Sequence, residues 1–489
     1  MSHPIIVIGE LEAHLDALAG VVRDRIDALR RSGVLRPGQP KKFRRTTILS
    51  ETPTSSSSTT TDYTRESWIW GEHVRTWTEL AKSQPYQAAE RLLPPPTLDS
   101  HGVLPRPLHA LMERMTILAA REPATYAEKA REQIQLFIRE MTGELLPFRA
   151  VIYMVGVIAK CETFSVAVDG FNCRVRAVTR EDNEREIEVK NQLPSWHYDE
   201  VPTAIVEMSG VSRDIRQIER AVGRLVAGLR LFAVGSVNTI YTEIDMASFY
   251  ESRGHSLDTV HVFGKPRTED VYERFILGDS RCQRFIGFWN AIGELIPAPF
   301  FLEVDATTTP LLIAFERYCD GLRPDPVFER RIASAVMGLE ALLSEGGAEL
   351  KYKLQTRVAK LLGTVEYPPL ETSLNVGLAY KVRSRFVHGD RLTAREARNY
   401  TQSAEGAEAF AARCLDYLRC TIAVFLLCNL DKEKVIRLID QALLDRSSET
   451  ALEQTLVRAV DLVADHSEPY ARGSRRIDHP LDPPRVRLP

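Results

Sequence analysis

Arg383 and His388 are the two residues of this sequence whose types and spacing best suit acid–base chemistry. Histidine has the side-chain pKa closest to neutrality, so it can both accept and donate a proton under physiological conditions. Arginine is permanently charged, planar and rich in donors, which suits it to stabilising negative charge at a phosphorus centre. As an isolated pattern the pair is short and common, and ordinary surface residues near a helix end explain it better.

Two helices are expected before this pair. The segment DPVFERRIASAVMGLEALLSEGG predicts a helix with Asp325 as N-cap, Pro326 at the first helical position and Gly346 just past the end. The segment KYKLQTRVAKLLG, residues 351–363, predicts a second helix, and Pro368 and Pro369 follow it as a break.

The pair itself lies on a third expected helix, ETSLNVGLAYKVRSRFVHGD. Its expected buried stripe is Leu374, Leu378, Val382 and Phe386, because these residues recur every four positions. Arg383 and His388 are then off the stripe near the C-terminal end, which Gly389 closes.

The surrounding segments give the pair more weight than its spacing does. LEALLS (339–344), KYKLQTRVAKLLG, YKVRSRFVHG (380–389) and LDYLRCTIAVFLL (415–427) follow one another in this order. Between about residues 320 and 430 the chain therefore resembles the Apea-like branch of the HEPN ribonuclease superfamily, whose motif is an arginine followed four to six residues later by a histidine.

The resemblance implies an all-α HEPN-like bundle with Arg383 and His388 as catalytic residues and Ser384 at a position that the family often fills with a polar residue. It also implies a homodimer whose two motifs share one cleft. Such a site would cleave RNA without metal or other cofactor, leaving 2′,3′-cyclic phosphate and 5′-hydroxyl ends. His388 would move the proton and Arg383 would stabilise the phosphorane.

Other residues near the motif have supporting or RNA-binding interpretations. Tyr380 is expected to pack, with hydrogen bonding into the cleft as the alternative, and Glu340 and Arg357 are expected to brace the bundle as a buried pair. Three further cations could form an RNA phosphate track or a solvated face, and these are Lys381, Arg385 and Arg391.

Composition describes an ordinary folded protein with reduced cysteines. Of 489 residues, 44% are hydrophobic and 26% charged, and the net charge of -3 argues against a generally basic nucleic-acid-binding surface. The seven cysteines are scattered, with no C-x-x-C pair, so neither a disulfide framework nor a metal site is expected. We expect a cytoplasmic protein without a signal peptide or a membrane-spanning segment.

The chain is long enough for several domains, and its expected fold class is multidomain α+β. Residues 1–145 are expected to be mostly helical, with a Ser/Thr-rich loop at 50–64. Residues 146–310 predict an α+β domain, because alternating residues on both sides of Asp169-Gly170 predict a β-hairpin. Residues 311–465 are expected to form the HEPN-like helical domain, and 466–489 a flexible tail.

The N-terminal two-thirds has no phosphate-binding glycine loop and no paired metal motif. His197, Asp199 and Glu200 form one polar cluster in which a surface loop is favoured over a site. Trp68, Trp70 and Trp77 could stack on bases, but a core patch is favoured.

The leading hypothesis is an RNA endonuclease, acting on tRNA or other RNA as a toxin-like or antiphage defence effector, with N-terminal domains that sense or regulate. The alternative is a non-catalytic HEPN-like protein that dimerises or binds RNA. A third possibility is a separate enzymatic site in the middle region, which no residue constellation supports.

Overall fold

The computed structural model describes two compact units and most of the chain. The described residues are 8–33, 41–52, 55–65, 79–93, 107–161, 163–184, 202–212, 215–246, 249, 255–256, 275–301, 308–323, 327–346, 349–390, 393, 395 and 406–465. Unit 1 contains residues 1–147, 212–214 and 246–254, and unit 2 contains 148–211, 215–245 and 255–489. The boundary expected at residue 310 therefore lies inside unit 2.

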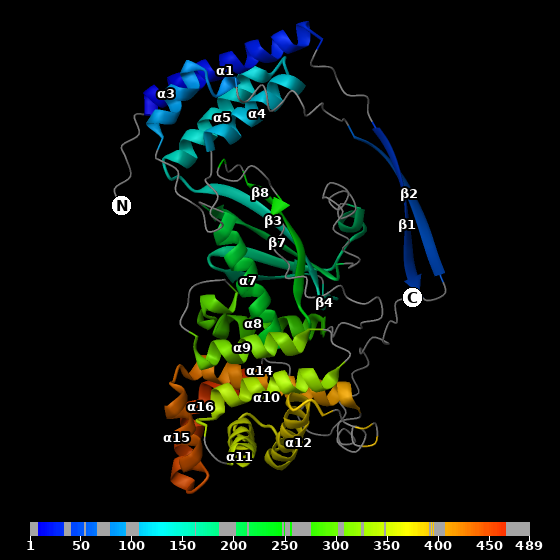
Figure 1. The fold of residues 1–489 in the computed structure, drawn as a ribbon, viewed down its shortest axis with the longest axis vertical. Helices are drawn as coiled ribbons and strands as arrows, with labels where there is room; N and C mark the ends of the chain where they lie inside the picture. Colours follow the sequence, from blue (N-terminus) through cyan, green and yellow to red (C-terminus); the bar gives the residue numbers. More distant parts are fainter. Residues whose placement is uncertain are drawn as a thin grey trace. The chain divides into compact units, whose positions relative to one another are not determined.

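Unit 1 is a group of helices with one β-hairpin. The helices are α1 (Ile8–Arg31), α3 (Gln84–Leu92), α4 (Pro107–Arg121) and α5 (Tyr126–Met141), and α1 packs against the other three (Figure 1). The buried face of α1 includes Leu11, Leu15, Leu18, Val22 and Leu29, which recur every three, four or seven positions. The Tyr126 hydroxyl donates to the Ala19 carbonyl at 2.8 Å and joins α5 to α1.

The Ser/Thr-rich segment is the main difference from expectation in unit 1. Residues expected as a loop instead lie at the end of β1 (Lys41–Thr52) and along β2 (Ser55–Arg65), which pair antiparallel. The physical reason is that threonine is β-branched and suits extended backbone, although the segment has few apolar residues for a core.

The sheet of unit 2 has the strand order β5-β6-β7-β3-β8-β9. Its strands are β3 (Leu146–Val155), β5 (Thr163–Val168), β6 (Phe171–Arg176), β7 (Ala204–Ser212), β8 (Asn238–Met246) and β9 (His255–Ser256). The expected hairpin is confirmed, since β5 and β6 pair antiparallel across Asp169-Gly170 and alternate between buried and exposed residues. Two short strands, β4 (Val157–Ala159) and β10 (Phe275–Leu277), form a separate parallel pair.

Two helices, α7 (Ile215–Phe232) and α8 (Asp279–Ile292), pack against β5 of the sheet. The Trp289 indole of α8 donates to the Ala167 carbonyl of β5 at 2.8 Å.

The rest of unit 2 is helical, and Figure 1 shows α9 to α16 beyond the sheet and its two helices. These helices are α9 (Pro310–Leu322), α10 (Phe328–Leu343), α11 (Leu350–Gly363), α12 (Pro369–Val387), α14 (Ala407–Cys428), α15 (Lys432–Ala442) and α16 (Arg446–Asp465). Helix α10 begins later than expected, with Val327 as N-cap, and Asp325 and Pro326 lie outside the described residues. In the described part of the chain no helix is long and apolar enough to span a bilayer.

Candidate functional site

The Arg383–His388 motif lies at the C-terminal end of α12. His388 is the C-cap, and its backbone N–H donates to the Ser384 carbonyl at 3.2 Å. Gly389 follows with φ +82°, the left-handed conformation that glycine adopts without strain when it closes a helix. The expected end of this helix is therefore confirmed.

The expected apolar stripe of α12 is wrong in part. Val382 is buried, but Leu374 is 64% exposed, and Leu378 and Phe386 are only half-buried. The buried face is less hydrophobic than expected and consists of Thr372, Asn375, Val376, Gly377, Ala379 and Val382. The physical reason is that small residues allow close packing against α10 and α11, and the polar Asn375 donates from Nδ2 to the Tyr417 hydroxyl at 3.0 Å inside the unit.

Arg383 is held by residues of two helices. Its Nη2 donates to Glu340 Oε2 of α10 at 3.1 Å, and its guanidinium carbon lies 5.9 Å from the centre of the Tyr380 ring. Burial raises the pKa of Glu340, and the charge of Arg383 opposes this shift. The structure thus brings Glu340, Tyr380 and Arg383 together, with the Tyr380 ring beside the Arg383 guanidinium.

The other residues of the motif are more accessible. His388 and Lys381 are exposed, and Ser384 and Arg385 are half-buried. Arg391 lies outside the described residues. Arg383 and His388 are five positions apart, which corresponds to a rotation of about 140° around a helix. On an ideal helix, two side chains with this spacing do not share a face.

The expected pairing of Glu340 with Arg357 is wrong. Arg357 of α11 instead donates from Nε and Nη2 to both carboxylate oxygens of Asp440, at 2.8 and 2.6 Å, and from Nη1 to the Leu343 carbonyl at 2.8 Å. This arginine braces α11 against α15 and the end of α10. The reason is geometric: a bidentate carboxylate and a helix-end carbonyl together satisfy the planar guanidinium.

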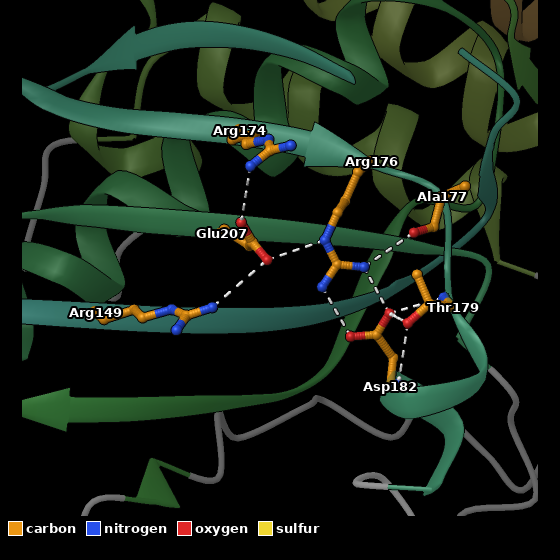
Figure 2. A network of polar contacts seen from close by, with 7 residues as sticks. All are labelled: Arg149, Arg174, Arg176, Ala177, Thr179, Asp182 and Glu207. Carbon is orange, nitrogen blue, oxygen red and sulfur yellow. Dashed lines mark hydrogen bonds and ion pairs between the residues drawn. The ribbon is translucent and has the colours of Figure 1, made fainter. Parts of the chain in front are cut away.

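A second polar network lies on the sheet (Figure 2). Arg176 of β6 donates to both Asp182 oxygens, at 2.5 and 2.8 Å, and its Nε donates to Glu207 of β7 at 3.0 Å. Arg149 and Arg174 approach the same Glu207 carboxylate at 3.7 and 3.9 Å. We interpret this network as structural, because its central arginine uses its donors within the fold.

Sequence reasoning missed a buried ionic cluster in α14. Arg419 and Asp416 are both fully buried and joined by a hydrogen bond from Nε of Arg419 at 2.9 Å. The Tyr367 hydroxyl donates to Asp416 at 2.6 Å, and burial raises the pKa of Tyr367 well above its usual value. The available signal was an aspartate and an arginine three positions apart within the apolar segment LDYLRCTIAVFLL.

Unit 1 contributes a groove between α1 and α5, about 970 Å³ in volume. Ala19, Ala130 and Ile134 lie along it, and its charged residues carry both signs. Histidine, cysteine, serine and lysine do not occur among its described lining residues, and its acidic residues are Asp16, Glu128 and Glu132.

Two further candidates from the sequence are not placed. The polar cluster at residues 197–200 and the tryptophans at 68, 70 and 77 lie outside the described residues. In comparisons with known proteins, no family model, no curated protein and no solved structure matches this chain. The motif at the end of α12 remains the strongest candidate for a site.

Proposed function

We propose that this protein is an RNA endonuclease that acts without a metal, with Arg383 and His388 as its catalytic residues. The observation that carries the proposal is that Glu340 and Tyr380 contact the guanidinium of Arg383 and so orient it. The exposed His388 follows five positions later in the chain. Holding a charged donor in place before the substrate arrives reduces the reorganisation that the transition state requires.

In the proposed reaction His388 accepts a proton from the 2′-hydroxyl, and the resulting oxygen attacks the adjacent phosphorus. Arg383 stabilises the negative charge of the phosphorane, and the bond to the 5′-oxygen breaks with proton transfer to the leaving oxygen. The products are a 2′,3′-cyclic phosphate and a 5′-hydroxyl. A 2′-deoxy nucleotide at the scissile position lacks the nucleophile and is left intact.

The proposed active assembly is a homodimer in which the two copies of α12 share a cleft. Two points support it: a spacing of five positions corresponds to about 140° of rotation on an ideal helix, and α12 has exposed apolar residues. Leu370 is 76% and Leu374 64% exposed, and burying such side chains between copies is favourable. The biological role we propose is that of a toxin-like or defence effector.

Cleavage of total RNA in EDTA tests the proposal. Wild-type protein should produce fragments with cyclic phosphate ends, while His388→Ala should slow cleavage by about 100-fold or more. His14→Ala, at a partly exposed position on α1, is the matched control and should cleave like wild type. Intact RNA with the wild type, or equal rates for wild type and His388→Ala, would reject the nuclease.

The ion pair of Arg383 with Glu340 favours a second candidate function, a non-catalytic HEPN-like protein that dimerises or binds RNA. In that case Arg383 is a structural residue of the α10–α12 contact. RNA bound but uncut by wild type and His388→Ala alike would support this candidate over the first.

The dimer has its own test. Leu374→Asp places a charge on the exposed face of α12, so it should convert a dimer to a monomer in analytical ultracentrifugation and abolish RNA cleavage, with folded stability within about 0.5 kcal/mol of wild type. Leu444→Asp is the control, because Leu444 is 86% exposed and follows α15. A dimer that persists in Leu374→Asp would remove α12 from the interface.

A further inference from the structure

Cys161 and Cys282 meet inside unit 2 although they are 121 positions apart. Their sulfur atoms are 2.8 Å apart, and both thiols are free. Cys161 lies between β4 and β5, and Cys282 is in the first turn of α8. Both are buried, with 6% and 2% of their surfaces exposed.

The secondary structure on both sides holds the two thiols in place. Strands β4 and β10 pair in parallel from Val157 with Phe275 to Ala159 with Leu277. The Lys160 N–H continues this pairing by donating to the Leu277 carbonyl at 2.9 Å. Only Gly278 separates β10 from α8. The strand pairing therefore brings the first turn of α8, with Cys282, next to Cys161, which follows Lys160.

Packing beyond the pair restricts movement of α8. The rings of Phe285 in α8 and Phe164 in β5 lie 5.8 Å apart in an edge-to-face contact. Cys161 is three positions before Phe164, and Cys282 is three positions before Phe285. The contact between these two rings therefore holds β5 and α8 together close to both cysteines. Their proximity follows from the fold rather than from the orientation of one flexible side chain.

The environment of Cys282 does not suit a nucleophile. Burial, followed by the contact with Cys161, raises the pKa of the Cys282 thiol well above its usual value. A catalytic cysteine needs a lowered pKa, so that the thiolate is present at neutral pH. The contact with the Cys161 sulfur at 2.8 Å instead places Cys282 where it can form a cross-link.

We propose that Cys161 and Cys282 form a reversible disulfide when the protein meets a small oxidant such as hydrogen peroxide. The sulfur–sulfur bond of a disulfide is about 2.05 Å long, so the two atoms need to approach by less than about 1 Å. This site is independent of Arg383 and His388 and of the proposed nuclease.

The reaction balances with peroxide as the oxidant. The Cys161 thiolate, formed by loss of its proton to water, attacks one peroxide oxygen, which gives a sulfenic acid and releases hydroxide that takes up a proton. The Cys282 sulfur then attacks the Cys161 sulfur, the sulfur–oxygen bond breaks, and the oxygen leaves as water with the Cys282 proton. Two thiols are oxidised by two electrons in total, and one peroxide is reduced to two waters.

The cross-link closes a long stretch of chain and so restricts the unfolded state more than the folded state. Oxidised protein should therefore resist urea better than reduced protein, with the unfolding midpoint raised by about 1 M. Dithiothreitol should reverse the shift. In Cys282→Ser the oxidised and reduced samples should unfold at the same urea concentration.

The direct test uses the full-length reduced protein treated with hydrogen peroxide. After denaturation and alkylation, mass spectrometry should show two of the seven thiols protected, with the peptides of Cys161 and Cys282 linked. Cys428→Ser is the matched control, because Cys428 is less buried than Cys161 and Cys282 and its sulfur lies 4.0 Å from the Thr455 carbonyl oxygen. It should still form the cross-link, whereas Cys161→Ser should not.

Two results would overturn the proposal. One is oxidation of Cys161 to sulfenic or sulfinic acid without any link to Cys282. The other concerns the case in which the native protein does not react because peroxide reaches the buried pair slowly. The protein is then unfolded, reduced and refolded in a glutathione redox buffer. Absence of the Cys161–Cys282 link from the refolded protein would then reject the site.

Discussion

Arg176 shows how one side chain can hold a turn against a sheet. Besides Asp182 and Glu207, its Nη1 donates to the Ala177 carbonyl at 3.0 Å. Asp182 also accepts from the Thr179 backbone N–H and hydroxyl, both at 2.7 Å. Figure 2 shows Thr179 and Asp182 on the segment that follows β6, so this network fixes the exit of the strand.

The carboxylate of Asp182 should make stability depend on pH. Burial favours a higher pKa, but the hydrogen bonds from Arg176 and Thr179 prevail and lower the pKa of Asp182 to about 2. In an unfolded chain an aspartate has a pKa of about 3.9. Because the folded value is the lower one, the stabilisation is fully present above about pH 5 and is lost as pH falls towards 2.

Asp182→Asn should therefore lower the free energy of unfolding by about 2 kcal/mol at pH 7. The difference from wild type should shrink as pH falls from about 5 to 2, measured by urea unfolding at each pH. Glu184→Gln is the control, because its ion pair with Arg180 is exposed and worth about 0.5 kcal/mol or less. A difference that does not change with pH would contradict the assignment.

At the scale of elements, the link between β3 and β4 depends on Gly156. Its φ is +80°, and a Cβ at this position would overlap the backbone of Ser236 and Val237. Gly170 in the β5–β6 turn has almost the same φ, +82°, but a Cβ there would meet nothing within 4 Å. Comparing substitutions at the two glycines therefore distinguishes the cost of backbone strain, common to both, from the cost of steric overlap, present only at Gly156.

Gly170→Ala should cost about 1 kcal/mol, because only the left-handed backbone is strained. Gly156→Ala should cost about 3 kcal/mol or more, since Ser236 and Val237 must also move. Thermal unfolding of both variants measures the difference. Equal losses in the two variants would mean that the backbone near Ser236 adjusts freely.

At the scale of the whole molecule, buried polar contacts join the sheet region of unit 2 to its C-terminal helices. Arg419 of α14 donates to the Leu231 and Phe232 carbonyls at the end of α7, at 2.8 and 3.0 Å. The Tyr318 hydroxyl of α9 donates to the Arg230 carbonyl at 2.7 Å. These contacts satisfy helix-end carbonyls that a separate domain would leave for water.

Arg419→Ala should lower the free energy of unfolding of unit 2 by about 3–5 kcal/mol, because the Asp416 carboxylate would remain buried without a compensating positive charge. Hydrogen exchange should show amides of β7 and α14 losing protection together. Arg413→Ala, in the same helix but paired with the half-buried Glu371, should cost about 1 kcal/mol. Loss of protection in α14 alone would indicate that the two regions unfold independently.

Local patterns in the sequence were sufficient for most of the secondary structure. The glycine that closes α12 and the hairpin at Asp169-Gly170 both appear where they were expected. Such features depend on neighbours a few positions away, so periodicity and turn residues reveal them. The hydroxyl-rich strand β2 differs from the expected loop, because its polar composition is typical of a loop while its threonines favour extended backbone.

For the candidate site, too, some features follow from the local sequence and others from the tertiary structure. The sequence by itself determined that Arg383 and His388 lie at the end of a helix, since the spacing to Gly389 is local. Only the tertiary structure decided that Arg383 contacts Glu340, that Arg357 contacts Asp440 and that Leu374 faces outward. Those partners are 43 and 83 positions apart, and their choice depends on which helix faces pack, a property of the assembled core that no local pattern contains.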